Sequence, residues 1–196
     1  MKPATSALLF LIVANLAGPT VLYAQDNANP QRADPQRAIV ERADETAKAF
    51  EEERITDPTV FVKSAALGLL TNIELAKLAG MQATQPGLRT YAARALREHQ
   101  TIRTELATIA KRKHLDVPTS LVYEDEQMVG RASEMSGAEF DTWYADRIVI
   151  EQDKSIALFR AASTLPDADL AAFAKKTLTA LEQQKAATSL ATAPSP

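Results

Sequence analysis

The feature that most constrains this chain is a series of apolar residues at helical spacing between Pro86 and His114. The intervals alternate between four and three residues through Leu88, Ala92, Ala95, His99, Ile102, Leu106 and Ile109. That spacing places all seven on one face of a long α-helix. His99 stands in the middle of this face, where a leucine would be expected. The pattern therefore predicts a titratable ring inside a helical core, as a ligand or as a buried polar residue with partners.

Three further long helices are predicted from their start signals and apolar spacing. Asp57 and Pro58 are a typical N-cap and first helical residue, and they open a helix that runs to about residue 81. Ser136 and Glu139 have the spacing of a capping box at the start of a helix over 137–163. A fourth helix follows over 168–188, and residues 120–134 form either a short fifth helix or a long connection. The fold expected is all-α, an up-down four-helix bundle with one extra short helix between the second and third long helices.

Residues 1–24 have the pattern of a secretory signal peptide. Lys2 precedes an apolar run over 7–17, which is short for a membrane-spanning helix, and we expect cleavage after Ala24. An uncleaved N-terminal anchor is the alternative. We expect a periplasmic or envelope-associated bacterial protein with no transmembrane span in the mature chain. Residues 25–56 would be a linker, disordered or weakly helical, before a bundle domain over 57–188 and a disordered tail over 189–196.

Composition excludes several kinds of site. The 196 residues contain no cysteine, which rules out disulfides, thiolate metal sites and a cysteine nucleophile. The net charge is −3, and no basic patch with interleaved aromatic residues indicates nucleic-acid binding. The chain also has no glycine-rich phosphate loop or dinucleotide fingerprint. With two histidines, a hydrolytic triad would have to use His99 or His114, and we predict no catalytic residue.

Each predicted long helix carries one polar residue within its apolar face. These four are Asn72, His99, Gln152 and Gln184, and three acids lie close to them in sequence: Glu74, Glu98 and Glu151. Antiparallel helices would bring the four to similar depth as a core polar layer, unless some of them face outward. Zinc sites need three good nitrogen, sulfur or carboxylate donors, whereas amide side chains suit a hydrogen-bond network. We therefore expect a structural layer with no metal and no cofactor.

Several segments resemble the bacterial family of domain of unknown function 4142. They are FVKSAALGLLTNIELAKLAGMQA, YAARALREHQ, SGAEFDTWYADRIVIEQDKS and FAKKTLTALEQQKAA. The most specific is the run from Ser136 to Tyr144, in which Phe140, Asp141 and Tyr144 form the family framework. The resemblance implies an exported, ferritin-like bundle, and such proteins are often described as putative membrane or outer-membrane proteins.

The resemblance also implies a histidine-rich core of metal-binding type. It places glutamate at the position of Asn72, an acid before His99, and histidine at the positions of Gln152 and Gln184. This chain keeps His99 and the framework residues but has amides at the other three positions. The layer therefore corresponds to a degenerate metal-type site.

The function expected is that of a non-catalytic envelope or stress-associated interaction protein that acts through its surface. Its partner would be an unknown protein or a second copy of the chain. One alternative is a metal-binding or oxidant-handling protein that uses His99. A second alternative is a carrier of small apolar ligands between the alanine-rich helices.

Overall fold

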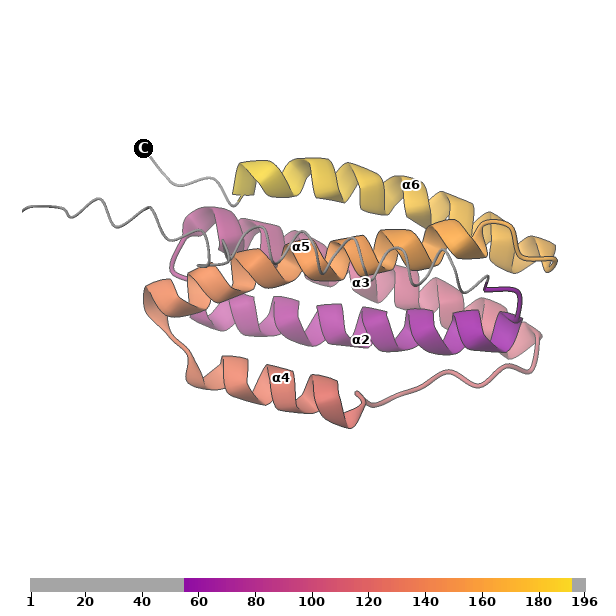
Figure 1. Ribbon diagram of the computed structural model, residues 1–196, viewed down its shortest axis with the longest axis horizontal. Helices are drawn as coiled ribbons and strands as arrows, with labels where there is room; N and C mark the ends of the chain where they lie inside the picture. Colours follow the sequence, from indigo (N-terminus) through magenta and orange to yellow (C-terminus); the bar gives the residue numbers. More distant parts are fainter. Residues whose placement is uncertain (1–54, 192–196) are drawn as a thin grey trace, which may run out of the picture. The chain divides into compact units, whose positions relative to one another are not determined.

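Residues 55–191 are described by a computed structural model, in which they form five helices (Figure 1). The helices are α2 (Pro58–Gln82), α3 (Pro86–Arg112), α4 (Tyr123–Glu134), α5 (Gly137–Ala162) and α6 (Ala168–Ala191). No strand occurs within 55–191, so the all-α prediction, with an extra short helix before the third long one, is confirmed. The predicted signal peptide and most of the predicted linker lie outside the described residues. Helix α6 extends to Ala191, past the predicted start of a disordered tail at residue 189.

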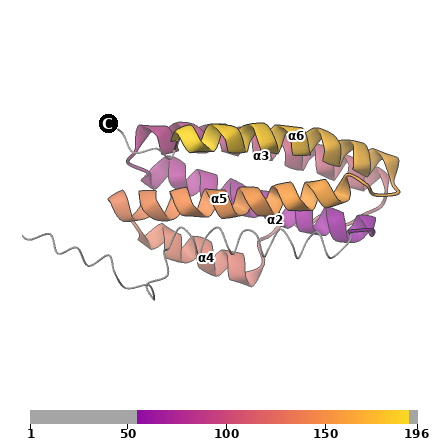
Figure 2. The same cartoon turned by 45° about the horizontal axis from the view of Figure 1, so that its top comes forward.

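The four long helices pack as a bundle, with α4 on the outside of α2. Helix α2 contacts α3 and α5, and α6 contacts the same two helices from the other side (Figures 1 and 2). The long helices that are neighbours in space run antiparallel, whereas α4 runs parallel to α2. The connection from α3 to α5 crosses the length of the bundle and contains α4, so α3 and α5 run in the same direction.

The predicted helix starts had different outcomes. The Asp57 side chain accepts a hydrogen bond from the Thr59 N–H at 2.7 Å, so the N-cap of α2 is confirmed. Ser136 does precede α5, but its side chain makes no capping hydrogen bond, and the predicted capping box is wrong. The reason is local: Gly137 has a φ of 61°, in the left-handed region, whereas a capping box needs helical backbone after the cap.

The apolar core consists of two clusters that meet along the bundle. One contains Phe61, whose ring meets that of Phe159 edge-on at 5.5 Å; the other contains Phe140, stacked on Tyr144 at 5.8 Å. Helices α2, α3 and α5 contribute to both clusters, and buried polar residues lie between the two contributions on each of these helices. On α3, for example, His99 falls between Ala95 of one cluster and Leu106 of the other, and Gln152 has the corresponding place on α5.

Helix α2 is the one helix in the described part of the chain that is long and apolar enough to cross a membrane. About half of its most apolar stretch, 56%, is buried inside the bundle. Core helices of bundles meet the same criteria of length and hydropathy, and α2 packs against α3, α4 and α5.

Candidate functional site

Three of the four residues in the predicted polar layer are buried, and one is not. His99, Gln152 and Gln184 are at most 5% exposed. Asn72 is only half-buried, and its amide donates to the Gly68 carbonyl of the same helix at 3.0 Å. The buried polar residue of α2 at this depth is the adjacent Thr71, which sequence reasoning missed. Its hydroxyl donates to Asp125 of α4 at 2.6 Å, so the predicted polar position on α2 was one residue off.

Gln152 joins three helices through its side-chain amide. Its Nε2 donates to the Tyr91 hydroxyl of α3 at 3.0 Å and to the Thr188 hydroxyl of α6 at 2.6 Å. Tyr91 and Thr188 are also hydrogen-bonded to each other, and burial raises the pKa of Tyr91 to about 12. The three side chains therefore form a closed, neutral polar cluster. Within the described residues the Gln152 Oε1 has no hydrogen-bond partner.

His99 behaves as a neutral packing residue. Burial lowers the pKa of its imidazole to about 4, and its Nδ1 atom is buried with no hydrogen-bond partner among residues 55–191. No hydrogen bond joins His99 to Gln152 or Gln184 within that range, so the buried members of the predicted layer do not form one network. No three His, Asp or Glu side chains of the described chain lie close enough together to hold a metal ion.

The three nearby acids have separate surroundings. Glu151 is buried on α5, where its carboxylate is 2.5 Å from Arg147 and 3.1 Å from Lys154. Glu74 pairs with Lys77 of its own helix at 2.8 Å. Only Glu98 meets a member of the predicted layer: its Oε2 accepts a hydrogen bond from the Gln184 amide at 3.0 Å.

The framework residues at the start of α5 have a structural role. The buried Asp141 carboxylate accepts hydrogen bonds from the backbone N–H groups of Thr84 at 2.9 Å and Gln85 at 3.0 Å, and from the Thr84 hydroxyl. The stacked rings of Phe140 and Tyr144 pack beside it, and burial raises the pKa of the Tyr144 hydroxyl above its ordinary value. These residues therefore attach α5 to the turn between α2 and α3.

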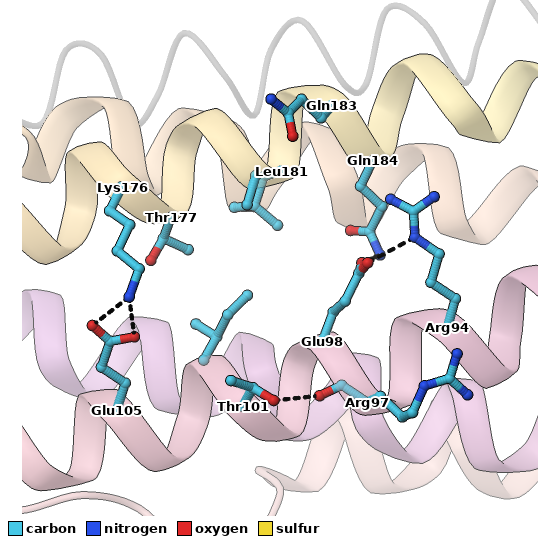
Figure 3. Close-up of a pocket in the computed structure, with 12 residues that line it drawn as sticks. Arg94, Arg97, Glu98, Thr101, Glu105, Lys176, Thr177, Leu181, Gln183 and Gln184 are labelled. Atoms are coloured by element: carbon cyan, nitrogen blue, oxygen red, sulfur yellow. Dashed lines mark hydrogen bonds and ion pairs between the residues drawn. The ribbon is translucent and has the colours of Figure 1, made fainter.

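A groove of about 340 Å³ runs between α3 and α6 (Figure 3). At one end Glu98 accepts hydrogen bonds from Arg94 Nε at 2.7 Å and from Gln184. At the other end Lys176 binds both carboxylate oxygens of Glu105, at 2.8 and 2.9 Å. Leu181 lies between the two ends (Figure 3). Ile102 and Ala180 also line the groove, at positions between the end residues of their helices. The groove thus has charged ends and a largely apolar middle, to which Thr101 and Thr177 also contribute.

Sequence reasoning missed this groove as a site. The spacing of Arg94 and Glu98 by four residues is a recognisable helical ion pair. The pairing of Glu105 with Lys176 joins positions 71 residues apart, and nothing in the local sequence indicates it.

Together these features define a class of protein: an all-α helical bundle with buried polar side chains in its core and a groove between α3 and α6. The sequence matches the family described as domain of unknown function (DUF4142) over residues 40–189, and the chain belongs to that family. The match begins upstream of the bundle start predicted at residue 57. No curated protein and no solved structure matches the chain significantly.

Proposed function

We propose that this protein is a non-catalytic binding protein of the bacterial cell envelope that acts through the groove between α3 and α6. The single observation that carries the proposal is the groove itself, whose two carboxylates already have basic partners from the protein. Because these ion pairs already hold the side chains of the groove in place, fewer side chains have to be ordered when a ligand binds, and the entropic cost of binding is lower. Export rests on the signal-peptide pattern of residues 1–24.

The buried polar residues support a surface function over chemistry in the core. Gln152 is occupied by Tyr91 and Thr188, and His99 is neutral and enclosed. Catalysis by acid, base or nucleophile requires such groups to be paired with one another and reachable by a substrate. The metal-dependent alternative has no cluster of acids and histidines among residues 55–191 to support it.

The alternative of a small-ligand carrier is favoured by one observation. The groove's volume falls at the lower end of the range of roughly 300–1,000 Å³ found for small-molecule sites. Its charged ends do not suit a purely apolar ligand, so a carrier function would need a ligand with a charged group.

Native mass spectrometry of the full chain, purified from its own host without denaturation, tests the proposal. Ala180 lines the groove and is exposed, so Ala180→Trp fills the groove, while Ala172→Trp alters an exposed position of α6 outside it. We expect the wild-type chain and Ala172→Trp to retain a non-covalently bound species that Ala180→Trp lacks. The proposal is wrong if no chain carries bound material, or if all three carry it equally.

A further inference from the structure

We propose that the ligand of this groove is a small amphipathic anion, with its headgroup on Arg94 and Arg97 and its apolar body along Ile102, Ala180 and Leu181. The shared headgroup chemistry is a carboxylate or a phosphate monoester. This inference rests on the proposed function, since it names the ligand class of the same groove.

The arginines at one end of the groove are arranged to receive an anion. Arg94 uses its Nε atom to bind Glu98, and its two terminal nitrogens have no hydrogen-bond partner among the described residues. Arg97 lies one turn away on the same helix and makes no ion pair within residues 55–191. The planar guanidinium fork binds carboxylate and phosphate groups through paired hydrogen bonds. Glu98 therefore holds Arg94 in place and leaves its fork available.

The balance of charge favours an anionic over a cationic ligand. Three basic side chains line the groove, Arg94, Arg97 and Lys176, against the two carboxylates of Glu98 and Glu105. Both carboxylates are already bound, by Arg94 and Gln184 at one end and by Lys176 at the other. A cationic ligand would meet carboxylates whose charge is already balanced by Arg94 and Lys176, whereas an anion meets guanidinium groups that have hydrogen-bond donors to spare.

The middle of the groove sets the size of the apolar part. Glu98 and Glu105 mark its two ends and are seven residues apart on α3, which corresponds to about 10 Å along the helix axis. Ile102, Ala180 and Leu181 lie between them. An alkyl chain of about that length would cover the apolar stretch and end before the Lys176–Glu105 pair.

Titration of the full chain by calorimetry and by amide NMR tests this inference with four probes of equal chain length. They are octanoate, octyl phosphate, octyltrimethylammonium and octanol. We expect saturable binding of one or both anions, with shifts confined to α3 and α6, and weaker binding of octanol and octyltrimethylammonium. Octanoate and octyl phosphate together distinguish a carboxylate from a phosphate headgroup.

Matched variants test the residues involved. Arg94→Gln and Arg97→Gln should each weaken anion binding about tenfold, the effect of losing one charge-assisted contact. Lys175→Gln removes an exposed cation of α6 beside the groove residue Lys176 and should leave the affinity unchanged. Thermal unfolding of each variant checks that the bundle stays folded.

The inference is overturned if octyltrimethylammonium binds as tightly as the anions, if both arginine variants keep the wild-type affinity, or if the ligand-free chain forms a dimer that Ala180→Trp abolishes. The last would make a second copy of the chain the occupant. If no octyl probe binds while host-purified protein carries a groove-dependent species, the ligand class is wrong and the proposed function stands. If octanoate binds while host-purified protein carries nothing, the groove chemistry is right and the proposed function fails.

Discussion

Asp141 of α5 and Thr84 of the α2–α3 turn are joined by two hydrogen bonds, one to the backbone N–H of Thr84 at 2.9 Å and one to its hydroxyl. A third, from the Gln85 N–H at 3.0 Å, places the carboxylate at the N-terminus of α3. Backbone N–H groups at a helix start have no partner within the helix, and negative charge is favoured there. The two residues are 57 positions apart, so this contact fixes one helix pair against the other.

Replacing Asp141 by alanine should lower the free energy of unfolding by about 3 kcal/mol, because a buried carboxylate that accepts several charge-assisted hydrogen bonds is lost. Urea unfolding of the full chain measures the change. Glu139→Ala, at an exposed position in the first turn of the same helix, is the control and should stay within about 0.5 kcal/mol of wild type. Equal effects in the two variants would mean that Asp141 does not anchor α5.

His99 should make the protein less stable in acid. Its pKa is about 4 in the folded state and 6.5 when unperturbed, so as pH falls the unfolded chain binds the proton first. The contribution of neutral His99 to the free energy of unfolding is therefore fully present above pH 6.5. It is lost as the pH falls from 6.5 towards 4, at up to about 1.4 kcal/mol per pH unit.

His99→Leu isolates this contribution, because all other titrating groups are common to both proteins. The unfolding free energy of each protein is measured between pH 4 and pH 8. The difference between the two proteins should be constant above pH 6.5 and should shift in favour of His99→Leu as the pH falls from 6.5 towards 4. Parallel curves would show that His99 is not held neutral in the core.

The buried carboxylate of Glu151 depends on its basic neighbours. Arg147→Met removes the contact at 2.5 Å and should cost about 2–3 kcal/mol, because a buried charge is left with Lys154 alone. The double variant Arg147→Met/Glu151→Leu removes the charge as well and should recover most of that loss. Denaturant unfolding of both variants gives the answer, and a double variant as unstable as the single one would argue against a charge effect.

The helices were predictable from sequence because their signals are local. Asp57 and Pro58 begin α2, and the spacing through Leu88, Ala95 and Leu106 identifies the buried face of α3. The burial of His99 followed from the same spacing. The prediction that Ser136 caps α5 was wrong because it rested on residue types alone. The backbone of Gly137, with its positive φ, prevents the capping geometry, and this conformation is seen only in the folded chain.

The contacts of the candidate site were less predictable, because they depend on how each helix is rotated about its axis. Thr71 and Asn72 are neighbours about 100° apart around α2, and which of them is buried depends on how α2 packs against the other helices. The meeting of Gln184 with Glu98 spans 86 positions. Spacing within one helix cannot reveal such pairs.

The central claim is that the polar residues of the core hold the bundle together and that binding takes place at the surface. Metal content measures it most directly: the full chain and His99→Ala, both purified from metal-rich medium without chelators, are analysed by inductively coupled plasma mass spectrometry. We predict iron, zinc and copper well below one ion per chain, with no difference between the two proteins. A stoichiometric metal in the wild-type chain that disappears in His99→Ala would contradict the account.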